Sequence, residues 1–75
     1  ERRTENHKLG ARLKGAVAAL PFVQREAFLL HQEGGLSLAE IAELTGAGVE
    51  TVKSRLRYAT NKLRSELSDL YEVRE

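Results

Sequence analysis

Apolar residues recur at three- and four-residue intervals through the last third of this 75-residue chain. The series comprises Val49, Val52, Leu56, Ala59, Leu63, Leu67 and Leu70. Alternating intervals of three and four place side chains on one face of an α-helix. The spacing therefore predicts a long helix from Val49 to about Leu70, with its apolar face turned toward the rest of the chain.

A shorter helix is predicted just before it, over residues 38–44, and both of its ends are marked in the sequence. Ser37 and Glu40 have the S-x-x-E spacing of a capping box, in which each side chain binds the other residue's backbone N–H. Gly46 follows the last apolar position, and glycine adopts a positive φ without steric cost. The helix is therefore expected to begin after Ser37 and to stop at Gly46.

These two helices are predicted to cross closely. Ala42 is small, and Val52, ten residues later, is expected to pack against it. The turn over residues 45–48 contains Gly46 and Gly48. Two helices that cross steeply over a turn of three or four residues form a helix-turn-helix.

Two more helices are predicted upstream, on either side of Leu20-Pro21. Proline disfavours helix in the residue before it and suits the first turn of the helix after it. The first helix is expected from about His7 to Ala19, on the apolar positions Leu9, Leu13, Ala16, Val17 and Leu20. The second is expected from Phe22 to Gln32, with Val23, Ala27, Leu30 and His31 on one stripe and Phe28 beside it. Residues 1–8 are charged and aperiodic, and a linker or disordered tail is expected there.

The fold class that follows is all-α: a four-helix, bundle-like domain that contains a helix-turn-helix and ends in a long C-terminal recognition helix. The single proline and the scarcity of β-branched runs agree with it. The chain does not begin with Met, which suggests a domain of a longer protein.

The composition argues against several kinds of chemistry. The chain has no cysteine, and its two histidines, His7 and His31, are isolated from one another. The sequence also lacks a Gly-rich phosphate loop. A metal site, a cofactor and catalytic residues are therefore not expected, and the protein is not expected to be an enzyme. No apolar run approaches the ~18 residues of a membrane span, and the lack of cysteine suits a reducing cytoplasm, where the protein is expected.

Charge is segregated onto the last helix. The formal net charge of the chain is only +1, but the stretch from Lys53 to Arg64 holds five cations and no acid: Lys53, Arg55, Arg57, Lys62 and Arg64. A cationic second helix in a helix-turn-helix is typical of one that enters the DNA major groove.

The apolar stripe decides which positions of this helix face outward. The N-terminal part of a recognition helix meets base edges, so the candidate base-reading residues are Glu50, Thr51, Lys53, Ser54 and Arg57. Lys62 and Arg64 lie further along and are expected to contact phosphate. The helix start at Ser37 is a further phosphate site.

Several of these residues have simpler alternatives. Lys53 and Arg57 could form a merely solvated face, and Thr51 could serve the first turn of its own helix. Tyr58 could be a partly exposed packing residue rather than a DNA contact. Arg55 lies near the core edge, where an ion pair with Glu40 or Glu43 is expected instead of a DNA contact. Arg25 and Glu26 are interpreted as surface residues.

With these residues placed, residues 12–68 resemble region 4 of bacterial ECF-type sigma factors. The resemblance rests on five motifs: Leu20-Pro21, Gln24-Arg25-Glu26, Gly35-Leu36-Ser37, Glu40-Ile41-Ala42 and Thr51-Val52-Lys53-Ser54-Arg55. Many members of the family continue S-R-x-x-R-A, whereas this chain has Tyr58 in that arginine slot and Arg57 one residue earlier.

The resemblance implies a domain over residues 9–71, with residues 72–75 as a C-terminal tail. It implies recognition of the −35 promoter element in double-stranded DNA, with Lys53 and Ser54 at base-reading positions. It also implies binding to the β-subunit flap of the RNA polymerase core and control by an anti-sigma factor. The departure at Tyr58 leaves the preferred −35 sequence open, with Arg57 as a substitute contact.

Two alternatives remain at this stage. LuxR-type response regulators also have four helices and a T-V-K motif, but they usually continue with x-H, where this chain has Ser54-Arg55. A helical protein-interaction module is the second alternative, with Leu63, Leu67 and Leu70 as its contact surface.

Overall fold

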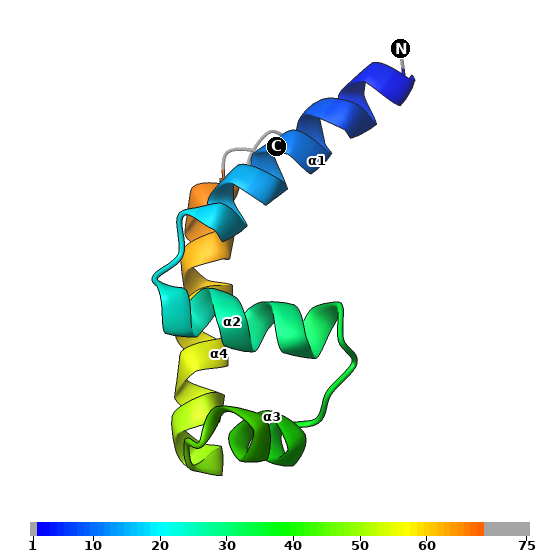
Figure 1. The fold of residues 1–75 in the computed structure, drawn as a ribbon. Helices are drawn as coiled ribbons and strands as arrows, with labels where there is room; N and C mark the ends of the chain where they lie inside the picture. The colour runs from blue at the N-terminus through cyan, green and yellow to red at the C-terminus, as the bar shows by residue number, and fades with distance from the viewer. Residues whose placement is uncertain (1, 69–75) are drawn as a thin grey trace.

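The computed structural model describes residues 2–68 of the chain, and four helices make up this part (Figure 1). They are α1 (Arg2–Ala18), α2 (Phe22–Gln32), α3 (Leu38–Thr45) and α4 (Val49–Glu66). Residues 2–68 contain no strand. The predicted all-α class is confirmed, and so are the bounds of the second helix and the starts of the third and fourth.

Helix α4 is the element on which the other three pack. Figure 1 shows α3 beside the start of α4, α2 across its middle, and α1 leading away from the other end. The apolar stripe of α4 therefore serves two separate clusters of buried side chains. One cluster holds the helix-turn-helix together, and the other joins the end of α1 to the second half of α4.

The first cluster is centred on Ile41, Ala42 and Val52. Ile41 and Val52 are both 0% exposed, and Ala42, the small residue of the cluster, is 8% exposed. Partly buried side chains of α2, α3, α4 and the two turns between them pack against this centre: Leu30, Leu36, Leu38, Ala47 and Leu56. Ala42 and Val52 thus lie in one buried cluster, in agreement with the predicted close crossing of α3 and α4.

The second cluster contains the buried residues Leu20, Ala59 and Leu63. Leu20 comes from the turn after α1, and Phe28 of α2 packs against the same group. The second half of the α4 stripe therefore contacts the α1 end of the fold. Leu67 is also buried, whereas Leu70 lies outside the described residues.

Both ends of α3 follow the predicted chemistry. The Glu40 N–H donates to Ser37 Oγ at 3.1 Å, and the Ser37 N–H donates to Glu40 Oε1 at 2.8 Å, which completes the capping box. Gly46 has φ 77° and its N–H donates to Ala42 O at 2.9 Å. This left-handed residue ends α3 and redirects the chain into α4.

Three local expectations differ from the structure. Helix α1 begins at Arg2, well before His7, because the charged segment is composed largely of residues that tolerate a helix even without an apolar face. Leu44 and Val49 are 66% and 44% exposed, so these two apolar positions do not join the core. In α2, Ala27 is buried but His31 is exposed. The apolar face of α2 therefore does not include His31, in contrast to the prediction.

Arg25 is not a simple surface residue. Its Nη1 donates to Ala18 O at 3.1 Å and to Leu20 O at 3.0 Å, and its guanidinium lies 5.8 Å from the centroid of the Phe22 ring. Ala18 is the last residue of α1, whose final carbonyl groups have no partner inside the helix. Arg25 therefore caps α1 from α2 and fixes the turn between them.

Two glycines are expected to respond in opposite ways to alanine. A Cβ at Gly34 meets Leu30 O at 2.6 Å, whereas a Cβ at Gly15, inside α1, meets nothing within 4 Å. Gly34→Ala should lower the free energy of unfolding by about 1–3 kcal/mol through the backbone clash. Gly15→Ala should raise it by about 0.5–1 kcal/mol through better helix propensity. Urea unfolding followed by circular dichroism measures both, and an unchanged stability of Gly34→Ala would contradict the structure of the α2–α3 turn.

Candidate nucleic-acid interface

The predicted DNA-contacting side chains lie almost entirely on the surface. The exposed residues are Ser37, Glu50, Thr51, Lys53, Arg57, Tyr58, Lys62 and Arg64. Ser54 is half-buried. Helix α4 is continuous from Val49 to Glu66, so it presents the outward positions as one rigid surface.

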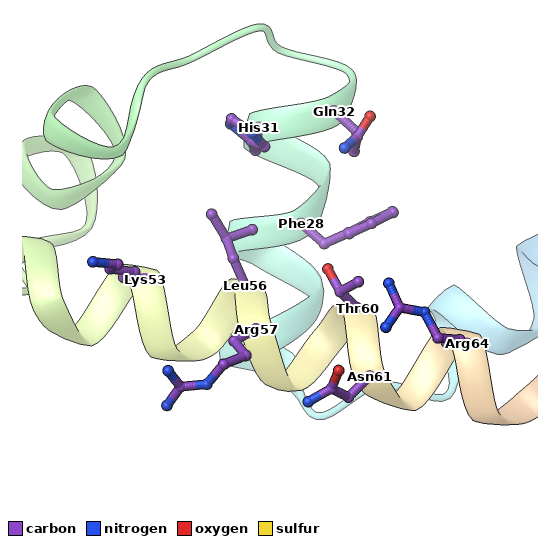
Figure 2. Close-up of a pocket in the computed structure, with 9 residues that line it drawn as sticks. All are labelled: Phe28, His31, Gln32, Lys53, Leu56, Arg57, Thr60, Asn61 and Arg64. Atoms are coloured by element: carbon purple, nitrogen blue, oxygen red, sulfur yellow. The ribbon is translucent and has the colours of Figure 1, made fainter.

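The cations on α4 point to different sides of the helix (Figure 2). Lys53 and Arg64 lie on the side that faces α2, and Arg57 projects from the other side. No acidic residue occurs between Glu50 and Glu66 in this helix. Positive charge is therefore present on more than one side of α4 and does not follow a single line of residues.

Tyr58 is 56% exposed, and the Arg57 guanidinium lies 5.7 Å from the centroid of its ring. The residue is therefore partly exposed, which agrees with the packing alternative as well as with a DNA contact. A cation over an aromatic face at this distance gains roughly 0.5–1 kcal/mol at an exposed site. The contact limits the orientations of Arg57, the residue next to the family's usual arginine position.

Arg55 does not form the expected ion pair. Its side chain is half-buried, and among the described residues 2–68 no ion pair joins it to Glu40 or Glu43. The Glu40 carboxylate is already engaged by the Ser37 N–H in the capping box. Glu43 is exposed on α3.

A basic groove of about 510 Å³ lies between α2 and α4. Its lining consists of Phe28, His31 and Gln32 from α2 and Lys53, Leu56, Arg57, Thr60, Asn61 and Arg64 from α4. Figure 2 shows Phe28 and Leu56 between the two helices, with the polar side chains around them. Three of the lining side chains are cationic and none is acidic, so the groove suits an anionic ligand.

His31 and Gln32 are groove residues that the sequence did not indicate as functional. They lie on α2, outside the helix-turn-helix motif, and only the packing of α2 on α4 brings them beside Lys53 and Arg57. The His31 ring is also fixed by a contact between Nδ1 and Leu36 O at 2.9 Å. His31 thus connects the α2–α3 turn to the edge of the groove.

Among residues 2–68, no group of three or more His, Asp or Glu side chains is placed to hold a metal ion. None of the described helices combines the length and the apolar character needed to span a lipid bilayer.

A capped α3, a left-handed glycine turn and an exposed cationic α4 define a DNA-binding domain of the helix-turn-helix class. The family model for sigma-70, region 4, matches residues 11–63. The chain therefore belongs to the sigma-70 region 4 family.

A curated relative supports this assignment. The chain is 39% identical over 64 residues to the ECF RNA polymerase sigma factor RpoE of Cereibacter sphaeroides. The match covers 85% of this chain and 35% of that relative, so the chain spans about a third of the relative's length. No solved structure matches the chain.

Proposed function

We propose that this chain recognises the −35 element of promoters, in the major groove, as the DNA-binding part of a sigma factor that directs RNA polymerase to initiate transcription. The observation that carries the proposal is the acid-free, exposed surface of α4 between Glu50 and Glu66. It belongs to the second helix of a helix-turn-helix, the helix that reads bases in this class. The domain has no enzymatic role in this proposal.

The residues divide by their distance from the start of α4. Thr51, Lys53, Ser54 and Arg57 lie in the first half, where side chains reach base edges; lysine and arginine donate to guanine, and serine contacts any base. Glu50, in the first turn, can accept from cytosine N4. Tyr58 presents an exposed ring beside Arg57.

Phosphate contacts are assigned to three other residues. Lys62 and Arg64 lie on the second half of α4, beyond the positions that reach base edges, and they hold the helix in register on the duplex. Ser37 lies at the start of α3. Its hydroxyl accepts the Glu40 N–H, and its own hydrogen remains available to donate to a phosphate oxygen.

Polymerase binding requires a surface that DNA leaves free. An apolar groove of about 400 Å³ lies between α1 and α2, lined in part by Leu13, Val17, Phe28 and Leu29. None of the proposed DNA contacts lines this groove. We assign it to the β-subunit flap of the polymerase core. The relative's description as an RNA polymerase sigma factor supports the polymerase as a partner. We also propose that the protein acts in the bacterial cytoplasm and is controlled by an anti-sigma factor.

Binding to selected DNA tests the proposal. Duplexes enriched from a random pool at low salt should bind the chain more tightly than scrambled versions of the same duplexes. The logarithm of the affinity should fall with the logarithm of the salt concentration by about 0.9 per neutralised phosphate. Fluorescence anisotropy measures both quantities.

Two results would contradict the proposal. An affinity that does not change with salt would exclude phosphate contacts altogether. Binding of two chains to one palindromic duplex would favour a homodimer of the response-regulator type, whereas a single chain per duplex is expected here.

A further inference from the structure

The contact between Arg57 and Tyr58 does not follow from their spacing on α4. Adjacent residues of an α-helix point about 100° apart around its axis, and their side chains do not face each other. The Arg57 guanidinium nevertheless lies 5.7 Å from the centroid of the Tyr58 ring. Figure 2 shows Arg57 projecting from the side of α4 away from α2. The long side chain of Arg57 therefore bends toward the ring.

The charges around Arg57 favour this orientation. None of the residues three or four positions from Arg57 on α4 is acidic, so no carboxylate at helical spacing holds the guanidinium. Lys53 and Arg64 line the basic groove on the α2 side, and like charges repel. The face of an aromatic ring carries partial negative charge and attracts a cation. The Tyr58 ring is therefore the favourable neighbour for the guanidinium.

The Tyr58 ring lies where α4 passes the start of α2. It lines a hollow of about 360 Å³ together with Pro21, Gln24, Asn61 and Lys62. Lys62 is the one cation in this lining, so the ring side of α4 repels Arg57 less than the basic groove does. A tyrosine has few side-chain torsions and loses little conformational entropy in holding a neighbour. The ring is thus a rigid support for a flexible arginine.

The orientation of an arginine matters for reading a base. Two N–H groups of the planar guanidinium must meet O6 and N7 of a guanine together. A free arginine loses rotamer entropy when it forms such a contact, whereas one that is already oriented loses less. A ring that limits the orientations of Arg57 therefore strengthens binding to guanine, and leaves binding to other bases unchanged.

We propose that Tyr58 is a positioning residue for base recognition, which holds the Arg57 guanidinium in the orientation from which it donates to a guanine. Tyr58 then contributes to discrimination between base pairs only through Arg57. The inference rests on the proposed function, since it requires that Arg57 reads a base. The arginine and the ring together, and not the arginine alone, determine the preferred base pair.

A double-mutant cycle between the two residues tests the inference. Fluorescence anisotropy measures the affinity for a selected duplex, for its scrambled version and for duplexes in which each base pair is replaced in turn. Tyr58→Ala should weaken binding to the selected duplex about two- to fivefold, the factor that corresponds to an exposed cation–π contact. Binding to the scrambled duplex should not change. The discrimination that is lost should be at the base pair that Arg57→Ala also affects.

Two further variants show whether Tyr58 acts through Arg57. In the Arg57→Ala background, Tyr58→Ala should have no additional effect, because there is no guanidinium left to hold. Tyr58→Phe keeps the aromatic face and should bind like the parent, with the same preferred base pair.

Phe22→Ala is the matched control. Phe22 is 64% exposed, and the Arg25 guanidinium lies 5.8 Å from the centroid of its ring. The variant therefore also removes an exposed ring beside an arginine, but on α2 and outside the proposed DNA contacts. It should leave affinity and discrimination unchanged. Thermal unfolding of every variant checks that the fold is kept.

Three results would overturn the inference while leaving the proposed function intact. Equal weakening by Tyr58→Ala in the parent and in the Arg57→Ala background would make Tyr58 an independent contact. A loss in Tyr58→Phe as large as in Tyr58→Ala would assign the effect to the hydroxyl group. Unchanged binding by Tyr58→Ala or by Arg57→Ala would leave nothing to position. If the parent does not prefer the selected duplex over the scrambled one, the proposed function is contradicted as well.

Discussion

Replacing Ile41 by alanine should lower the free energy of unfolding by about 2–5 kcal/mol, the range for removing a large aliphatic side chain from a core. Ile41 is 0% exposed and packs with Ala42 and Val52 at the crossing of α3 and α4. A domain of this size has a small total stability. The variant is therefore expected to be largely unfolded at physiological temperature, which urea and thermal unfolding followed by circular dichroism would show.

Leu44→Ala is the matched control for this experiment. Leu44 lies on the same short helix but is 66% exposed, so its truncation should change the stability by less than about 0.5 kcal/mol. Equal losses for the two variants would mean that α3 does not pack through Ile41. The comparison separates burial from helix propensity, since both changes replace an aliphatic residue of α3 by alanine.

Lys53→Ala and Arg57→Ala should each weaken binding to a selected duplex by about 1–3 kcal/mol if the side chain donates two hydrogen bonds to a guanine. That range corresponds to roughly 5- to 150-fold in Kd. Discrimination against one base pair should be lost with each side chain. Arg64→Ala should instead weaken binding to all duplexes alike and reduce the salt slope by about 1.

The control for these variants is Lys14→Ala, because Lys14 is an exposed cation that lines the groove between α1 and α2. It should leave DNA affinity nearly unchanged. Fluorescence anisotropy with selected and scrambled duplexes distinguishes the outcomes. Unchanged binding by both α4 variants would refute the proposed docking face, and equal weakening on both duplexes would move Lys53 and Arg57 from base contacts to phosphate contacts.

The parts of the fold that the sequence predicted correctly depend on local rules. The capping box at Ser37 and the positive φ at Gly46 involve residues only a few positions apart. The α4 stripe is equally local, because helical periodicity alone decides that Val52, Ala59 and Leu63 share a face. The class of the fold and the outward position of Lys53 and Arg57 followed from these rules.

The features that the sequence did not predict depend on how separate helices meet. The cap that Arg25 supplies to α1 requires the turn at Pro21 to bring α2 under the last carbonyl groups of α1. The place of His31 in the basic groove requires the packing of α2 on α4. The prediction of an ion pair for Arg55 was wrong for the same reason, because the position of a residue on one helix does not give its distance to a carboxylate on another helix.

The division of the core into two clusters along α4 has a consequence for how the molecule opens. The Leu20–Ala59–Leu63 cluster and the Ile41–Ala42–Val52 cluster share no buried residue, so the contacts of α1 can be lost without disturbing those at the α3–α4 crossing. Partial unfolding events in small proteins follow such boundaries. Detachment of α1 would therefore leave a smaller folded unit that still presents Lys53 and Arg57.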